Sequence, residues 1–191
     1  CKKTPNGKLS IQFGHHRFEA ARKLNIPVCY MVYNVDFEIF AENETTNTWS
    51  LRDYLDCHVR DGDMVSLAIK KYHEETGISL SQCIGILGGH SDKDYDKSKA
   101  FKRKTFGISP ESLNRADKIK KLVLHSVKVD KDIGKCRSYI TALTKMVRVD
   151  SFDINTYISK LESNREMFVK QIDMDGYIHM IESIYNRRSQ V

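Results

Sequence analysis

The feature that most constrains the fold is a series of helix starts spread over residues 50–191. Each start is a Ser or Asp whose side chain can accept a hydrogen bond from the first helical turn, and apolar residues follow it three or four positions apart. These starts are Ser50, Ser79, Ser109, Asp153 and Asp173. Repeated capped segments with one apolar side predict a helical region whose apolar faces pack together.

Glycines and a proline mark further boundaries in this region. Gly77 ends the helix that precedes Ser79, and Gly88 ends the helix that follows it. Two helices joined by a glycine-containing turn match a helix-turn-helix outline, an arrangement that many helical hairpins share. We therefore predict a helix-turn-helix-like region with a basic arm over residues 50–107. Pro110, directly after a capping serine, opens a predicted helical bundle over residues 108–191.

Residues 1–49 have a different pattern. The alternation of Leu9–Phe13 predicts a strand, and residues 16–24 predict a short helix that ends before a proline. The uninterrupted apolar run Val28–Tyr33 predicts a strand buried on both faces. The order strand, turn, helix, strand is typical of α/β and α+β domains. The predicted fold class is α+β, with a small α/β lobe followed by a mostly helical region.

The turn before the predicted short helix is the first candidate site. It contains Gly14, His15, His16 and Arg17. The first N–H groups of a helix lack partners within the helix, and the helix dipole places positive charge there, so this turn is expected to attract anions. Arg17 can hold a phosphate through two parallel hydrogen bonds. The two histidines diverge by about 100° around a helix, so we predict no joint metal site.

Positive charge is concentrated in the middle of the chain. The net charge is +6, yet residues 93–148 alone hold 16 Lys and Arg against 6 Asp and Glu. Such a concentration predicts contact with a polyanion such as DNA, and a solvated basic surface is the alternative. The candidate DNA contacts are Lys97, Lys99, Lys102, Arg103, Lys104, Lys118, Lys120 and Lys121.

Residues 91–107 combine basic and aromatic side chains. They suit a docking arm that contacts phosphates and stacks on bases. The alternative is a short hairpin in which Phe101 and Phe106 pack beneath neighbouring helices.

The stretch Phe13–Ala21, followed by Ile26-Pro27-Val28, resembles the core of the ParB/sulfiredoxin superfamily. In that family a Gly-x-x-Arg turn binds nucleotide phosphates, and Glu42-Asn43 resembles the family's second motif. The resemblance implies nucleotide or phosphate binding by Gly14 to Arg17 with Glu42 and Asn43, and a nucleoside triphosphate with Mg²⁺ as the candidate ligand. The family's first strand and helix precede the turn, so the lobe is expected to be N-terminally incomplete.

Two positions depart from the family. His15 stands where sulfiredoxins have a cysteine, so their thiol chemistry is not implied, and the arginine that follows the Glu-Asn motif in partition proteins is absent. The chain is most similar to ParB-like proteins of phages and mobile elements, whose helical tails end like Ile184–Arg188.

We therefore expect a ParB-like, DNA-associated protein that binds an anion at the Gly-x-x-Arg turn and DNA backbone through the basic helices. The alternatives are a ParB-like nuclease or nucleotide-hydrolysing enzyme, in which His16 moves protons and Arg17 stabilises charge, and a non-catalytic phage interaction protein. Enzymatic activity is the less favoured alternative, because catalytic motifs such as a Walker loop or a His-Glu-x-x-His pair are absent from the sequence.

The composition also leads to expectations about the cysteines, membrane contact and cellular location. The five cysteines are scattered without a Cys-x-x-Cys pair, which predicts free thiols and no zinc site. The apolar runs are shorter than the ~20 residues of a membrane span, so we expect no membrane partner. A secretory leader is not evident in the sequence, and a cytoplasmic location is expected. Homodimerisation is left open.

Overall fold

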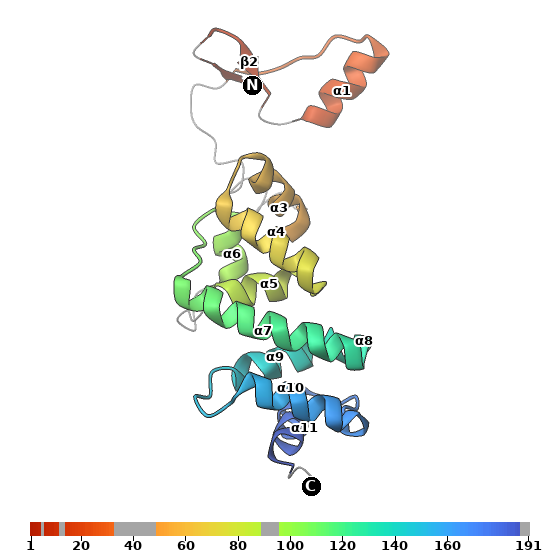
Figure 1. Cartoon of the computed structure of the whole chain (residues 1–191). Coiled ribbons are helices and arrows are strands. Elements are labelled where there is room, and N and C mark those ends of the chain that lie inside the picture. The colour runs from red at the N-terminus through yellow and green to blue at the C-terminus, as the bar shows by residue number, and fades with distance from the viewer. Residues whose placement is uncertain (5, 12–13, 33–48, 89–95, 188–191) are drawn as a thin grey trace. The chain divides into compact units, whose positions relative to one another are not determined.

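The computed structural model describes residues 1–4, 6–11, 14–32, 49–88 and 96–187. The chain forms two compact units, residues 1–49 and residues 50–191, and each is described by itself (Figure 1). The described residues are mostly helical, with one small antiparallel sheet of two strands. The sequence predicts an α+β class with a mostly helical second part, and the described residues agree with this at the level of the broad class.

The N-terminal unit contains the sheet and one helix. Strands β1 (Lys2–Lys3) and β2 (Leu9–Ser10) pair antiparallel, with Lys2 opposite Ser10 and Lys3 opposite Leu9. Helix α1 (His15–Leu24) confirms the predicted short helix. It ends at Asn25, whose left-handed backbone (φ 52°) lets its N–H bond to the carbonyls of the last turn.

The predicted buried strand at Val28–Tyr33 is wrong over its described part. Residues 28–32 form no strand, and Tyr30 and Met31 are 61% and 65% exposed. The amino terminus of Cys1 donates a hydrogen bond to the Met31 carbonyl of this segment at 2.8 Å. A doubly buried strand needs neighbouring strands and a covering layer, and the described part of this unit supplies neither.

The helical unit begins with four helices that pack together. These are α3 (Leu51–Arg60), α4 (Met64–Thr76), α5 (Leu80–Leu87) and α6 (Lys97–Lys102). Helix α4 ends at Gly77 (φ 66°), as the sequence predicts. Helix α5 contacts α3, α4 and α6, and its Cys83, Ile84, Ile86 and Leu87 are buried.

Helix α7 (Pro110–Val129) joins these helices to the rest of the unit. It packs on α4 and α5, and also on α8 (Lys131–Gly134), α9 (Arg137–Met146) and α10 (Ile154–Ser163), as Figure 1 shows. Ile119, Leu122 and Val123 of α7 are fully buried. The 3₁₀ helix η1 (Arg165–Met167) and α11 (Met174–Asn186), which packs on α9 and α10, complete the unit.

All five predicted helix starts are confirmed. The capping side chains accept hydrogen bonds from backbone N–H groups at these pairs: Ser50 from Asp53, Ser79 from Gln82, Ser109 from Ser112, Asp153 from Thr156 and Asp173 from Gly176. The first three are capping boxes, in which the third helical residue bonds back to the cap.

A buried polar network crosses the interior between α7, α9 and α10. The Ser126 hydroxyl donates to the Leu122 carbonyl at 2.9 Å and lies 2.6 Å from the Tyr139 hydroxyl. The Tyr139 hydroxyl in turn lies 3.2 Å from that of Tyr157. Burial raises the pKa of Tyr139 to about 12, so the network stays protonated and uncharged.

Candidate functional site

The Gly14–Arg17 turn opens helix α1. Gly14 adopts φ 82° and ψ 24°, a left-handed conformation that disfavours a side chain, and its carbonyl accepts from the Phe18 N–H at 2.9 Å. No side chain caps this helix, and its first turn holds no acidic residue. His15, His16 and Arg17 are exposed. The turn therefore keeps the positive end of α1 open to solvent, as an anion site requires.

Glu19 and Arg22 pair with each other further along α1, with 2.8 Å between the guanidinium and the carboxylate. Glu42 and Asn43, the other predicted ligands of this site, lie outside the described residues.

Four of the eight predicted DNA-contacting side chains are bound within the helical unit. Lys104 lies 2.5 Å from the Asp61 carboxylate, and Lys120 lies 2.6 Å from that of Glu75. Lys97 donates to the Gly85 carbonyl at 3.0 Å, and Lys121 donates to Asn155 at 2.7 Å. These contacts fix the four ammonium groups against neighbouring helices and reduce the positive charge that Lys104 and Lys120 present to a ligand.

The other four predicted contacts lie nearer to solvent. Lys99, Arg103 and Lys118 are exposed, and the ammonium of Lys102 lies 5.5 Å from the centre of the Tyr54 ring. In the described part of the chain, the side chains of Lys99 and Lys118 form no ion pair or hydrogen bond.

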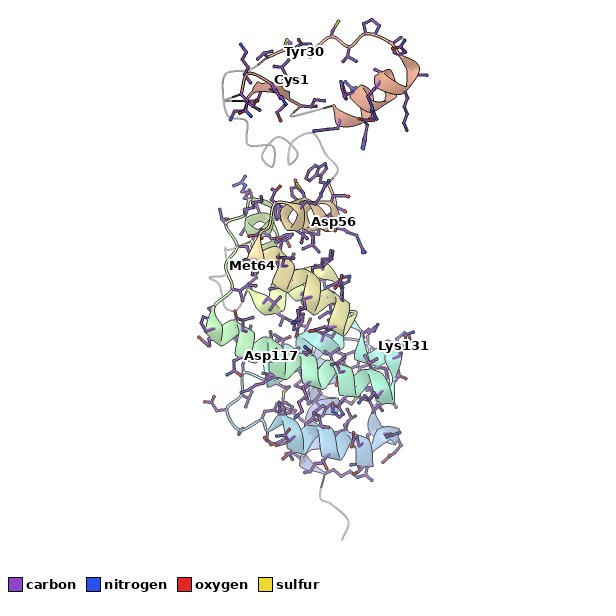
Figure 2. All side chains as sticks on the ribbon, turned by 45° about the horizontal axis from the view of Figure 1, so that its top comes forward. Cys1, Tyr30, Asp56, Met64, Asp117 and Lys131 are labelled. Carbon is purple, nitrogen blue, oxygen red and sulfur yellow. The ribbon has the colours of Figure 1, made fainter. Side chains whose placement is uncertain are left out.

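The structure adds exposed cations that sequence reasoning did not single out. Lys128, Lys131, Arg137 and Lys145 lie on or beside α7, α8 and α9, and all four are exposed. Figure 2 shows Lys131 at the start of α8 and Asp117 on α7. All four lie within residues 93–148, so the charge pattern of that segment already pointed to them.

The described part of the basic arm, residues 96–107, packs against the helices instead of extending from them. Residues 97–102 form α6, and Phe101 and Phe106 are buried edge to face with ring centres 6.3 Å apart. A Cβ on Gly88 would come within 2.5 Å of the Phe106 ring, so this glycine permits the close packing. The alternative in which the phenylalanines pack beneath the helices is confirmed, although as a short helix and not as a hairpin.

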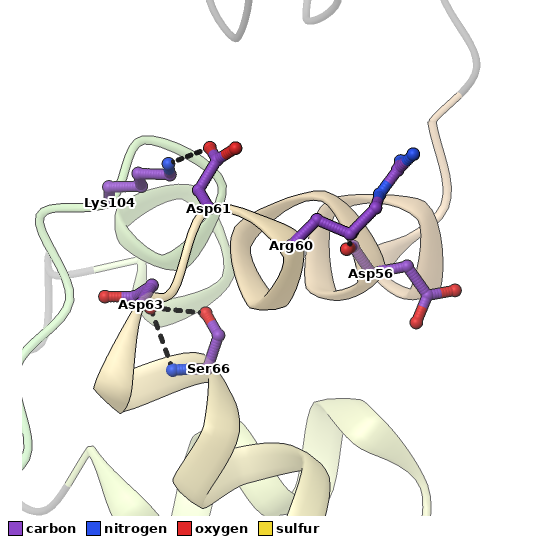
Figure 3. A network of polar contacts seen from close by, with 6 residues as sticks. All are labelled: Asp56, Arg60, Asp61, Asp63, Ser66 and Lys104. Carbon is purple, nitrogen blue, oxygen red and sulfur yellow. Dashed lines mark hydrogen bonds and ion pairs between the residues drawn. The ribbon is translucent and has the colours of Figure 1, made fainter.

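Acidic residues surround the point where the arm meets α3 and α4 (Figure 3). Asp63 caps α4 by accepting from the N–H and hydroxyl of Ser66. Burial opposes ionisation of Asp63, but the bonds from Ser66 and the charge of Lys104 hold its pKa below the ordinary value. The Lys104–Asp61 pair joins the arm to the end of α3, whereas the Asp63–Ser66 bonds lie within the start of α4.

His58 lies inside this junction and is fully buried. Its ring packs against Phe101 and Tyr54, at centroid distances of 5.2 and 6.2 Å. Burial and the positive charge of Lys104 lower the pKa of His58, so the imidazole is neutral at pH 7.

The helix-turn-helix outline is present in α4 and α5, which Gly77 and two further residues connect. Its second helix, however, carries no Lys, Arg, Asp or Glu, and most of its side chains are buried against other helices. A recognition helix must place polar side chains in a groove of DNA. The geometry therefore does not support α5 in that role.

Comparison of the chain with protein-family models, curated proteins and solved structures found no match. Within the described ranges, no group of three or more His, Cys, Asp or Glu side chains could hold a metal ion. A search of the same residues found no helix with the length and hydropathy needed to cross a membrane.

Proposed function

We propose that this protein binds the phosphate backbone of DNA through the exposed cations of helices α6 to α9. The observation that carries the proposal is the net charge of +10 over residues 93–148, which the sixteen cations and six acids of that segment produce. Exposed cations contact phosphates without reading bases, so the expected binding has little sequence preference.

The contacts within the protein decide which cations carry the interaction. Lys104 and Lys120 are paired with carboxylates, so we assign them a minor part. Lys99, Lys118, Lys128, Lys131 and Arg137 are exposed and form the main candidate surface. Helix α5 is given no role in this contact.

The test is a salt titration of binding to a fluorescent 20-base-pair duplex, followed by anisotropy. The logarithm of the association constant is expected to fall linearly with the logarithm of salt concentration, with a slope of about −0.9 per neutralised phosphate. The double variant Lys118→Glu with Lys128→Glu is expected to weaken binding at every duplex sequence and to flatten the slope by about 2.

The matched control is Lys71→Glu with Lys170→Glu. Both of these lysines are exposed outside the basic segment, and the control changes the net charge by the same amount. If the two double variants weaken binding equally, net charge and not this surface attracts DNA. Absence of binding by the unaltered protein at low salt would reject the proposal.

We also propose that the Gly14–Arg17 turn binds a phosphate group, as the resemblance to ParB-like proteins implies. The support is the left-handed Gly14, the uncapped first turn without acids, and the exposed Arg17. A ligand present at a hundred times its dissociation constant stabilises the folded state by about 2.7 kcal/mol. We expect nucleoside triphosphates with Mg²⁺ to raise the melting temperature, and Arg17→Ala to remove that rise.

Arg22→Ala is the control for this second proposal, because Arg22 lies on the same helix but pairs with Glu19. Equal responses of the two variants to every nucleotide would contradict a phosphate site at the turn. Measuring product formation in the same samples tests the enzymatic alternative.

A further inference from the structure

Cys136 occupies the cap position at the start of helix α9. The other long helices of this unit begin at Ser or Asp residues whose oxygen atoms bond to the first turn, whereas α9 begins at a thiol and has no such side-chain bond. Its backbone is extended (φ −62°, ψ 131°), and its side chain is partly exposed. The sulfur therefore stands beside the first N–H groups of a helix and remains accessible to small reagents.

A second side chain faces the same sulfur from helix α11. Tyr177 is only 1% exposed, and its hydroxyl forms no hydrogen bond of normal geometry within the described part of the chain. Helix α11 packs on α9, at whose start Cys136 stands, and the Tyr177 hydroxyl and the Cys136 thiol each alter the pKa of the other. A buried hydroxyl without a hydrogen bond of normal geometry is costly, so Tyr177 favours a sulfur that accepts more strongly, either as the thiolate or through an oxygen carried on it.

The surroundings of the thiol favour its ionised form. Partial burial opposes ionisation, but the Tyr139 N–H, the Tyr177 hydroxyl, the Ser138 N–H and the charge of Lys170 together lower the pKa of Cys136. Burial and the neighbouring Cys136 raise the pKa of Tyr177, so the tyrosine remains a hydrogen-bond donor. Asp130 is the acidic group that acts on this pair, and it too keeps Tyr177 protonated.

The other thiols with altered acidity behave in the opposite way. Cys57 is also partly exposed, but burial and the Asp61 carboxylate raise its pKa. Cys83 is buried, and burial raises its pKa to about 12. The chain thus contains its own control for Cys136, because Cys57 shares its exposure class but does not stand at a helix start, and the charges of Arg60 and Lys104 do not offset the effects of burial and Asp61 on its pKa.

We propose that Cys136 is a modification site, at which a hydroperoxide oxidises the thiolate to sulfenic acid. The sulfur attacks the terminal peroxide oxygen, an S–O bond forms, and the O–O bond breaks with loss of the alkoxide, which takes a proton and leaves as an alcohol. The sulfur loses two electrons and the peroxide gains them. The Tyr177 hydroxyl donates to the oxygen that the sulfur acquires, which gives this buried donor an acceptor.

The test is carried out on the whole chain with all five cysteines present. The protein is exposed to limiting hydrogen peroxide together with dimedone, which traps sulfenic acid, and each cysteine is then quantified by peptide mass spectrometry. We expect several-fold more dimedone on Cys136 than on Cys57, because the pKa of Cys136 is lowered, that of Cys57 is raised, and the thiolate is the form that reacts. Equal labelling of the two cysteines would overturn the proposal.

Two variants test the geometry. Tyr177→Phe keeps the ring and removes the hydroxyl, and Lys170→Met removes an exposed charge that does not contribute to the core. Each is expected to slow alkylation of Cys136 by iodoacetamide at pH 7 several-fold and to leave the rate at Cys57 unchanged. Because Lys170→Met cannot act through loss of packing, an unchanged Cys136 rate in that variant would contradict the electrostatic part of the argument.

Discussion

In the helical unit, apolar side chains from α3 to α11 meet in the interior, whereas in the described part of residues 1–49 apolar side chains lie mostly at the surface. Ala21 is the one buried residue among those described in the N-terminal unit. Ile26, Tyr30 and Met31 of that unit are more than half exposed. The contrast shows that apolar side chains form a core only where other described residues pack on them, and lie at the surface elsewhere.

The largest difference in unfolding free energy is expected when the same Leu→Ala substitution is made once in each unit. Leu122→Ala removes a fully buried side chain from α7 and is expected to lower the free energy of unfolding by about 2–5 kcal/mol. Leu24→Ala, at a leucine that is 70% exposed at the end of α1, is expected to change it by less than about 0.5 kcal/mol. Urea unfolding followed by circular dichroism measures both. Equal losses would remove the distinction between the units.

A smaller effect is expected from the buried tyrosine network, which has no equivalent in the described N-terminal residues. Tyr139→Phe deletes the hydroxyl that links Ser126 to Tyr157 and leaves two buried hydroxyls short of a partner. We expect a loss of about 1–3 kcal/mol in unfolding free energy. Thr141→Val, at an exposed position on the same helix, is the control and should cost much less.

The buried His58 predicts a pH dependence of the helical unit. Its folded-state pKa lies below the unfolded value of 6.5, so the unfolded chain binds the proton more tightly. The stability is fully present above pH 6.5 and is lost as the pH falls below that value toward the folded pKa, with a slope of at most about 1.4 kcal/mol per pH unit. Urea unfolding between pH 7.5 and 5.5 measures it.

His58→Gln is expected to reduce this slope. His15→Gln with His16→Gln in the exposed turn of the other unit should leave it unchanged. An identical pH profile for all three proteins would show that His58 does not control the acid sensitivity.

The smallest effect is expected from surface ion pairs, one from each unit. A double-mutant cycle on Lys104 and Asp61 is expected to give a coupling energy of about 0.2–1 kcal/mol, because both side chains are partly exposed. The more exposed Arg22–Glu19 pair is expected at or below the lower end of that range. Thermal unfolding in low salt measures both, and a larger coupling for Arg22–Glu19 would contradict the ranking.

The helices could be predicted because their signals are local. A Ser or Asp cap, Pro110 after its cap and Gly77 in a left-handed position act within one helical turn, and the predicted helix starts occur where the sequence placed them. The strands could be predicted only in part: the alternation of Leu9–Phe13 predicts a strand, and Leu9–Ser10 within it forms β2. Pairing of Lys2–Lys3 with Leu9–Ser10 depends on a partner segment, and the failure of Val28–Val32 to form a strand depends on the absence of a partner in the described unit.

The candidate sites follow the same rule: features set by neighbouring residues could be predicted, and contacts between distant residues could not. The exposed Gly14 turn follows from a strand-like segment, a glycine and a helix, all adjacent in sequence. By contrast, the pairing of Lys104 with Asp61 joins residues 43 positions apart, and Cys136 meets Tyr177 across two helices. Contacts of this kind depend on packing, so residue composition alone overstated the free positive charge of the arm and did not reveal the thiol.

Helix α7 has a consequence for how the helical unit can be divided. It packs on α4 and α5 and also on α9 and α10. Both groups of helices therefore depend on the same twenty residues to complete their interiors. A truncation that stops at residue 107 would remove the Ala116 carbonyl that accepts from the buried Tyr72 hydroxyl, and a fragment that starts after α7 would lose the Ser126 hydroxyl from its polar interior. A fragment that keeps either group of helices therefore needs α7 to cover its interior.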